Sequence, residues 1–255
     1  MNIRMPPAAG QRYNSGCQQT RVITEQWGEL NLYCPNCSSL KLGRLAHNTK
    51  ASDFRCPSCG FWFQLKGQKT RIGKCINDGA YSAMIEAIES NCTPSFYFMH
   101  YDLSTWSVKN LLLIPHFAFP KSAIIRRNPL GPTARRAGWV GCLISLVNIP
   151  VDARIPVVTD GAPESPELVR EQFRRIKPLA DLNVQARGWT LDVLNAIRSL
   201  GKSQFTNDDA YTLEARLSAL HPDNRNVRPK IRQQLQVLRD LGLLIHERPG
   251  LWRLP

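Results

Sequence analysis

The spacing of apolar residues changes between strand and helix periods along the first two thirds of the chain. Alternating apolar positions predict a strand over residues 61–66, and helical spacing predicts a helix from Gly79 to Ser90, capped by Asp78. Further strands are expected at residues 95–101, 108–114 and 155–159, and further helices at residues 18–27 and 167–176. Residues 121–142 have no clear period and are expected to be mostly irregular. This mixture predicts an α/β core.

The last third of the chain has a sharper pattern. Thr190 and Thr206 are placed to cap two helices, and Pro229 suits the first turn of a third. Two short strands are expected afterwards, at residues 243–247 and 251–254. Three helices and a terminal hairpin are typical of a winged helix-turn-helix. Periodicity is lost between residues 177 and 185, so we expect one domain over residues 1–182 and a second over residues 183–255.

The charge of the chain points to an anionic partner. The formal net charge of the 255 residues is +13, and residues 185–255 alone carry 11 Lys and Arg against 7 Asp and Glu. Both expected domains are basic, which favours nucleic acid. No apolar run approaches the ~20 residues that span a bilayer, and the first ten residues have no apolar signal core. We therefore expect a cytoplasmic protein with no membrane partner.

Four of the eight cysteines form two Cys-x2-Cys pairs. These pairs are Cys34 with Cys37 and Cys56 with Cys59, separated by 18 residues. This spacing is typical of a four-cysteine zinc site, and four thiolates leave no open position on the ion. We expect a structural zinc ion, and we interpret the other four cysteines as ordinary thiols.

The strand over residues 61–66 carries the candidate catalytic chemistry. Gln64 and Lys66 share one face of that strand, and Asp53 lies shortly before it. Asp-x10-Gln-x-Lys resembles the Asp…(Asp/Glu)-x-Lys arrangement of a large nuclease superfamily. Asp53, the Gln64 amide and the Leu65 carbonyl offer oxygen ligands to Mg²⁺, and Lys66 can orient the attacking water. From the residues alone, a surface Asp, Gln and Lys on a hairpin near zinc is the alternative.

Seven longer segments resemble one family in order along the chain. They are residues 23–27 (ITEQW), 33–37 (YCPNC), 53–56 (DFRC), 76–81 (INDGAY), 132–139 (PTARRAGW), 187–190 (RGWT) and 230–236 (KIRQQLQ). With these segments the chain resembles the DpnI family of methyl-directed (Type IIM) restriction endonucleases over nearly its whole length.

The resemblance implies a PD-(D/E)XK catalytic domain with a zinc site, followed by a winged helix. It implies Mg²⁺-dependent cleavage of duplex DNA at GATC sites whose adenine carries an N6-methyl group, by a monomeric prokaryotic restriction enzyme. Asp53 and Lys66 fall on the metal-binding Asp and catalytic Lys of the family. Gln64 stands where the superfamily usually has Asp or Glu, which puts full activity in question.

Basic residues in both domains are candidates for DNA contact. Arginine suits phosphates and guanine edges, and glutamine suits adenine edges. Trp139 is the candidate methyl sensor of the first domain, because an aromatic ring can close over a methyl group. The other expected contacts are Arg126, Arg127, Arg135 and Arg136, and in the third helix of the second domain Arg228, Lys230, Arg232, Gln233 and Gln234.

Two alternatives to the endonuclease remain open. In the first, Gln64 weakens the metal site so far that the protein reads methylated DNA without cutting it. In the second, the chain is a zinc-ribbon and winged-helix transcription factor, which binds a longer operator and ignores adenine methylation. A solvated basic loop between residues 121 and 142, or a protein-binding winged helix, would explain the charge without DNA contact.

Overall fold

The computed structural model describes the chain except for residues 47–48 and 50–51. The described residues form two compact units, each assembled from segments that are separate in sequence. The first unit comprises Met1–Gly73, Pro94–His116 and Ala153–Arg174. The second comprises Lys74–Thr93, Phe117–Asp152 and Arg175–Pro255. The second unit therefore combines the C-terminal region with two earlier segments.

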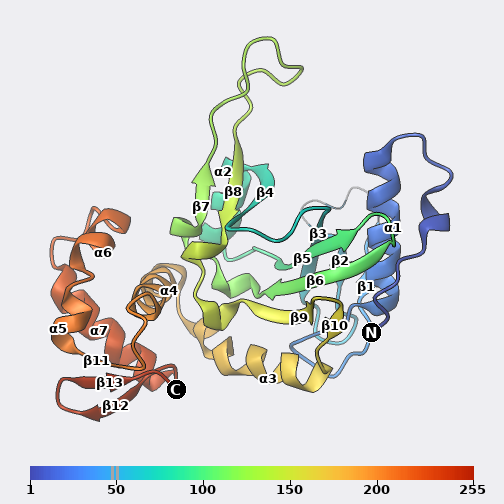
Figure 1. Ribbon diagram of the computed structural model, residues 1–255. Coiled ribbons are helices and arrows are strands. Elements are labelled where there is room, and N and C mark those ends of the chain that lie inside the picture. The colour runs from blue at the N-terminus through green and yellow to red at the C-terminus, as the bar shows by residue number, and fades with distance from the viewer. Residues whose placement is uncertain (47–48, 50–51) are drawn as a thin grey trace. The chain divides into compact units, whose positions relative to one another are not determined.

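A seven-stranded sheet forms the first unit (Figure 1). In spatial order its strands are β1 (Gly43–Arg44), β2 (Phe54–Arg55), β3 (Trp62–Gln68), β5 (Ser95–Asp102), β6 (Ser107–Ile114), β9 (Ile155–Thr159) and β10 (Ala162–Pro163). β3 and β5 run parallel, and the other neighbouring pairs are antiparallel. The four strands expected in this region are confirmed, and the expected helix over residues 167–176 is α3 (Pro166–Ile176).

Helix α1 (Gly16–Asn31) lies against the β3 side of this sheet (Figure 1). Trp27 is fully buried, and its indole N–H donates to the carbonyl of Asn2 over 2.8 Å. Gly28 permits the close approach of α1 to β2, because a Cβ at this position would lie 2.6 Å from Cζ of Phe54 in β2. Glu25 is one helical turn before Gly28 and therefore lies on the same face. This packing brings Glu25 toward Asp53, which directly precedes β2.

A three-stranded sheet and a helix begin the second unit. The sheet has the order β4 (Cys75–Ala80), β8 (Gly141–Ser145) and β7 (Ile124–Arg126), and the helix is α2 (Tyr81–Glu89). The expectation of an irregular segment over residues 121–142 was wrong at both ends, since β7 and β8 are too short to produce a visible alternation. Asp78 lies within β4, so Ala80 and not Asp78 is the N-cap of α2.

The residues between β7 and β8 form an extended hairpin, which we call the arm (residues 127–140). It projects from its own sheet in Figure 1. Backbone hydrogen bonds pair its two sides, from Arg127 to Gly141 and from Leu130 to Trp139. The side chains of the arm are mostly exposed, and those of Ala134, Trp139 and Val140 are half-buried.

The C-terminal region is helical with a small sheet, as expected for a helix-turn-helix domain. Its helices are α4 (Val184–Arg198), α5 (Asn207–Tyr211), α6 (Glu214–Leu220) and α7 (Val227–Asp240), and its sheet has the order β11 (Gln204–Thr206), β13 (Leu251–Arg253) and β12 (Ile245–Arg248). The first helix starts earlier than expected, because Asn183 and not Thr190 is the cap and accepts from the amide of Ala186 over 2.8 Å. Thr206 caps α5 in a reciprocal pair with Asp209.

Short 3-10 helices complete the described structure. They lie at Pro7–Gly10, His116–Ala118, Lys121–Ala123, Leu146–Asn148, Val151–Ala153 and Lys177–Asp181. Among the described residues, none of the helices is both long and apolar enough to cross a membrane.

Candidate functional site

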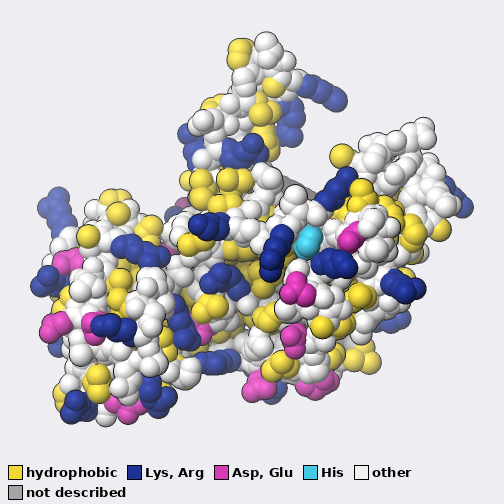
Figure 2. Space-filling model, in the orientation of Figure 1, with side chains coloured by type: hydrophobic (Ala, Val, Ile, Leu, Met, Phe, Trp, Pro, Cys, Tyr) yellow, Lys and Arg dark blue, Asp and Glu magenta, His cyan; other side chains and the backbone are white. Residues whose placement is uncertain are grey.

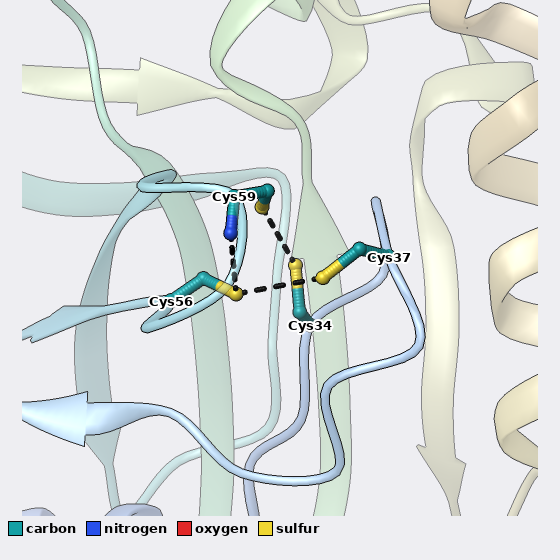
Figure 3. Close-up of side chains that lie close together, drawn as sticks. All are labelled: Cys34, Cys37, Cys56 and Cys59. Carbon is teal, nitrogen blue, oxygen red and sulfur yellow. Dashed lines mark hydrogen bonds between the residues drawn. The ribbon is translucent and has the colours of Figure 1, made fainter.

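The two Cys-x2-Cys pairs come together in the first unit. The sulfur atoms of Cys34, Cys37, Cys56 and Cys59 all lie within 4.8 Å of one another and converge on a common point (Figure 3). The Sγ–Sγ distance is 3.5 Å both for Cys34 with Cys59 and for Cys37 with Cys56. A tetrahedral zinc ion with four thiolates needs sulfur separations of about 3.8 Å. The cluster therefore fits a metal ion such as zinc.

The thiols of this cluster differ in acidity. Burial raises the pKa of Cys34 far above its ordinary value. Burial also acts to raise the pKa of Cys56, but hydrogen bonds from the Cys59 and Ser58 amides and from neighbouring thiols outweigh it and lower this pKa to about 6. Cys56 therefore carries a thiolate at neutral pH, which is the form that binds metal.

The cluster holds the hairpin that carries the candidate catalytic residues. Cys56 follows β2 directly, and its amide donates to the carbonyl of Phe61, just before β3. On the other side of β2, the amide of Asp53 donates to the carbonyl of Phe63 over 2.9 Å. A metal ion at the cysteines therefore fixes the register between Asp53 and β3.

Asp53 points back onto β3. Its Oδ2 accepts a hydrogen bond from the backbone amide of Leu65 over 2.8 Å. Leu65 lies between Gln64 and Lys66 in β3, and all three are half-buried. The structure thus brings Asp53 to the middle of the Gln-x-Lys segment, as the motif requires.

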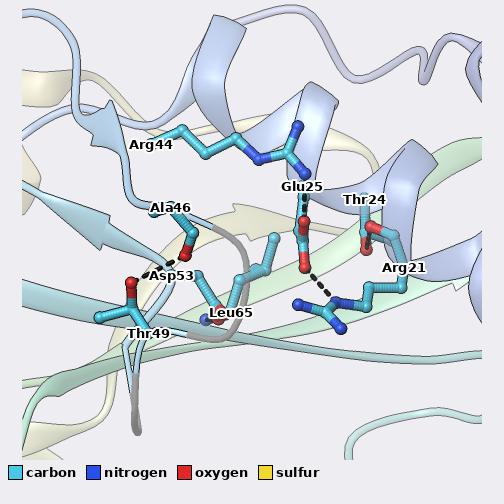
Figure 4. Close-up of polar contacts among 8 residues, drawn as sticks. All are labelled: Arg21, Thr24, Glu25, Arg44, Ala46, Thr49, Asp53 and Leu65. Atoms are coloured by element: carbon cyan, nitrogen blue, oxygen red, sulfur yellow. Dashed lines mark hydrogen bonds and ion pairs between the residues drawn. The ribbon is translucent and has the colours of Figure 1, made fainter.

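A second carboxylate lies beside Asp53. Glu25 in α1 is only 7% exposed, and Nε of Arg21 donates to its Oε1 over 2.5 Å. Arg44 in β1 donates to its other oxygen, so two guanidinium groups hold the carboxylate (Figure 4). These groups and Asp53 line one small cavity of about 20 Å³. Its walls are formed by Arg21, Glu25, Arg44, Leu45, Ala46, Thr49, Ser52 and Asp53.

The surroundings of Asp53 make its charge costly. Burial is the largest influence and raises its pKa above the ordinary value, and the nearby charge of Glu25 raises it further. The Leu65 amide, Lys66 and Arg21 act in the opposite direction without cancelling these effects. The same confined space also holds Arg21 and Arg44, whose guanidinium groups compensate the charge of Glu25.

Glu25 was not singled out from the sequence. It lies inside a segment that carries the family resemblance, but a single Glu in a helix usually faces solvent. A possible signal is Gly28, a buried residue one helical turn later on the same face, because a glycine within a helix often marks a close contact that also buries its neighbours. An acidic residue enclosed in this way needs a charged partner, which here is provided by Arg21 and Arg44.

The arm presents three of the six arginines expected to contact DNA, and a fourth lies at its base. Arg127, Arg135 and Arg136 are exposed on it, Arg126 is exposed at its base, and basic side chains stand out along it in Figure 2. Trp139 is half-buried, with the guanidinium carbon of Arg136 4.6 Å from the centre of its ring. Its ring also rests on Gly141, where a Cβ would lie only 2.8 Å from the ring atoms.

Helix α7 presents another basic surface. Arg228, Arg232 and Gln233 are exposed, and Lys230 is half-buried with its Nζ 5.8 Å from the centre of the Trp189 ring. Gln234 is placed differently from the others. Its side chain is buried, with 2% exposed, and its Oε1 accepts from the hydroxyl of Thr190 in α4 over 2.6 Å. Because Gln234 faces the interior of its domain, it does not belong to this surface.

Two family models match this chain. The model of the Dam-replacing family (DpnI) matches residues 1–182, and the model of the Dam-replacing HTH domain (DpnI_C) matches residues 185–253. Together they span nearly the entire sequence, so the cysteine cluster, the carboxylate pair and the arm fall in the first match and α7 in the second.

Proposed function

Because the chain belongs to the DpnI (Dam-replacing) family of restriction-type endonucleases, we propose that it is a Mg²⁺-dependent endonuclease that cleaves duplex DNA at GATC sites with N6-methylated adenine. We assign cleavage to a PD-(D/E)XK domain over residues 1–182. We assign methyl recognition both to this domain and to a winged helix over residues 183–255. The observation that carries the proposal is the position of Asp53, hydrogen-bonded to β3 beside a second buried carboxylate.

The residues around Asp53 have the chemistry that phosphodiester hydrolysis needs. We assign Asp53, the Gln64 amide and the Leu65 carbonyl as ligands of Mg²⁺, which when bound stabilises charge on the phosphate and acidifies water. Lys66 orients the attacking water. The water oxygen bonds to phosphorus and releases a proton to solvent as the bond to one ester oxygen breaks. The leaving oxygen takes up a proton.

Glu25 supplies a carboxylate near the metal site in which Gln64 replaces the usual Asp or Glu. An amide at this position removes one negative charge from the usual metal site, which weakens attraction of a divalent cation. Glu25 restores a second negative charge beside Asp53, as its effect on the pKa of Asp53 indicates. Its two arginine partners balance that charge until a metal ion and a phosphate bind. This arrangement favours an active enzyme.

The cysteine cluster has a structural role in the proposal. Four thiolates complete the coordination of zinc, so no position is left for water or substrate. Arg170 in α3 supports the cluster by donating to the carbonyls of Cys34 and Ser39, each over 3.2 Å. We therefore assign zinc to folding of the catalytic hairpin.

The DNA contacts divide between phosphates and bases. We assign Arg126, Arg127 and Arg135 to phosphates and Trp139 to the N6-methyl group of the adenine. Arg228, Lys230, Arg232 and Gln233 belong to the major-groove face of α7.

A cleavage assay tests the proposal. Purified full-length protein is mixed with Mg²⁺ and with GATC duplexes that are identical except for adenine methylation. We expect cleavage of the methylated duplex only, and complete loss of cutting in Lys66→Ala with its DNA affinity retained. Lys41→Ala is the matched control, because Lys41 is exposed and is assigned neither to the metal site nor to DNA contact, and it should cut normally.

Two outcomes would refute parts of the proposal. Selective binding of methylated DNA without cutting, at any Mg²⁺ concentration, would show a methyl-DNA reader, the alternative that Gln64 favours. Binding that is indifferent to methylation would leave a DNA-binding protein of another kind. Full activity of Lys66→Ala would place the catalytic group elsewhere.

A further inference from the structure

A shallow groove lies between helices α5 and α7 of the C-terminal region. Its volume is about 510 Å³, and it is lined by Tyr211, Arg228, Pro229, Arg232, Gln233 and Gln236. Three of these six residues belong to the DNA-binding face assigned above. The other three, Tyr211, Pro229 and Gln236, were not assigned any role.

Tyr211 is held firmly at one wall of this groove. It is the last residue of α5, whose start is fixed by the reciprocal cap between Thr206 and Asp209. The guanidinium carbon of Arg228 lies 5.6 Å from the centre of the Tyr211 ring. Nε of Arg228 also donates to Oε2 of Glu214 over 2.6 Å, which fixes the guanidinium in place. The ring and the arginine therefore form one ordered pair.

The opposite wall of the groove is a polar stripe of α7. Arg228, Arg232 and Gln236 are spaced four residues apart, so they lie along one side of the helix. Gln233 lies beside them, and all four are exposed. The other side of α7 is packed, because Ile231 and Leu235 are fully buried.

The chemistry of the groove suits one kind of base pair. In the major groove adenine offers N7 and its N6 amino group, which glutamine can pair with, and guanine offers O6 and N7, which arginine can pair with. An N6-methyl group adds an apolar projection next to these polar edges. The groove combines amides, guanidinium groups and one aromatic ring, whereas the remaining lining residue, Pro229, is a small apolar one.

We propose that Tyr211 is the methyl-contacting residue of the C-terminal domain, with Gln233 and Gln236 placed to pair with the same adenine. This inference rests on the proposed function, because it assumes that the protein recognises N6-methyladenine. The ring covers the methyl group and excludes water from it, while Arg228 keeps the ring in position. Tyr211 is thus a specificity-determining residue that lies outside the recognition helix.

Binding measurements on the full chain test this assignment. Fluorescence polarisation is recorded in Ca²⁺ without Mg²⁺, with duplexes that contain methylated or unmethylated GATC. The readout is the ratio of the two dissociation constants. We expect Tyr211→Ser to lower this ratio by about tenfold, near the lower limit of what one methyl group in a fitted apolar site provides. Tyr211→Phe keeps the ring and should keep the ratio.

Controls separate the possible failures. Tyr13→Ser removes an exposed tyrosine from the first unit and should change nothing. If the wild-type protein has a ratio of one, the proposed function itself fails. If the wild-type ratio is large and Tyr211→Ser leaves it unchanged, or weakens both duplexes equally, Tyr211 does not read the methyl group. Should Tyr211→Ser melt early, Tyr211→Leu replaces it, since leucine fills the space and should retain part of the ratio.

Discussion

At the scale of single residues, the buried carboxyl group of Asp53 in the proposed metal site lowers the stability of the folded protein. Asp53 has a raised pKa because burial and the charge of Glu25 both oppose its ionisation. The folded protein therefore binds this proton more tightly than the unfolded chain does. The contribution of Asp53 to stability falls as pH rises from the ordinary carboxyl pKa through the raised value, and above both values a constant penalty remains.

Replacing Asp53 should reveal that penalty. In Asp53→Asn the side-chain oxygen can still accept from the Leu65 amide, but the charge is gone. Without added Mg²⁺ at pH 7, we expect the melting temperature to rise by about 2–4 °C, the shift that roughly 1 kcal/mol produces at this chain length. Cleavage should be abolished. Asp102→Asn is the control and should give no rise, because the Ser104 hydroxyl and nearby amides lower the pKa of Asp102.

Adjacent glutamines of α7 should respond to substitution in opposite ways. Gln234 is buried against Thr190, so Gln234→Ala should cost about 1–3 kcal/mol of unfolding free energy through lost packing and a lost hydrogen bond. Gln233 is exposed on the groove, so Gln233→Ala should leave stability within ~0.5 kcal/mol and weaken DNA binding. Denaturant titrations and binding curves on both variants measure this. Equal loss of stability would contradict the assigned orientations.

At the scale of elements, the contact between α1 and β2 decides how the carboxylates meet. In Gly28→Ala the new Cβ would lie 2.6 Å from Cζ of Phe54, so the helix must shift. We expect a loss of about 1–3 kcal/mol, typical of an overpacked contact. Cleavage should fall further than DNA affinity, because Glu25 moves away from Asp53.

Gly16→Ala in the same helix is the matched control. No heavy atom lies within 4 Å of a Cβ at this position, so stability and cleavage should be unchanged. If Gly28→Ala melted like Gly16→Ala and cut DNA normally, the close approach of α1 would have no role in building the site. Melting curves and cleavage rates on the two variants decide this.

The elements also show what the sequence can predict. Long strands such as β5 and β6 and the cysteine spacing were predictable, because both follow from local patterns. The strands β7 and β8 were not, because strands of three and five residues gain their stability from pairing across the arm. Thr190 was expected to cap a helix, but Asn183 offers a cap about two turns earlier and frees Thr190 to bond Gln234.

The catalytic residues were predictable to a similar extent. Asp53 and Lys66 follow from motif spacing, since both belong to one hairpin. Glu25 was missed because its role depends on a contact between residues far apart in sequence, which local spacing does not encode. The buried orientation of Gln234 was also missed, although Gln234 is three residues after Ile231 and four before Leu238, so the helical period places it on the apolar face of α7.

At the scale of the whole molecule, charge should govern the encounter with DNA. The net charge is +13, so DNA affinity should fall steeply with salt, with a slope of about −0.9 per neutralised phosphate in a plot of log affinity against log salt. Arg135→Ala should make this slope shallower by about one, because we assign Arg135 to a phosphate. Its effect on the ratio between the affinities for methylated and unmethylated duplexes should be small.

Arg239→Ala is the matched control, since Arg239 pairs with Asp240 at the far end of α7 from the groove. Titrations at several salt concentrations measure both slopes, and an unchanged slope in Arg135→Ala would remove the arm from the phosphate-binding surface.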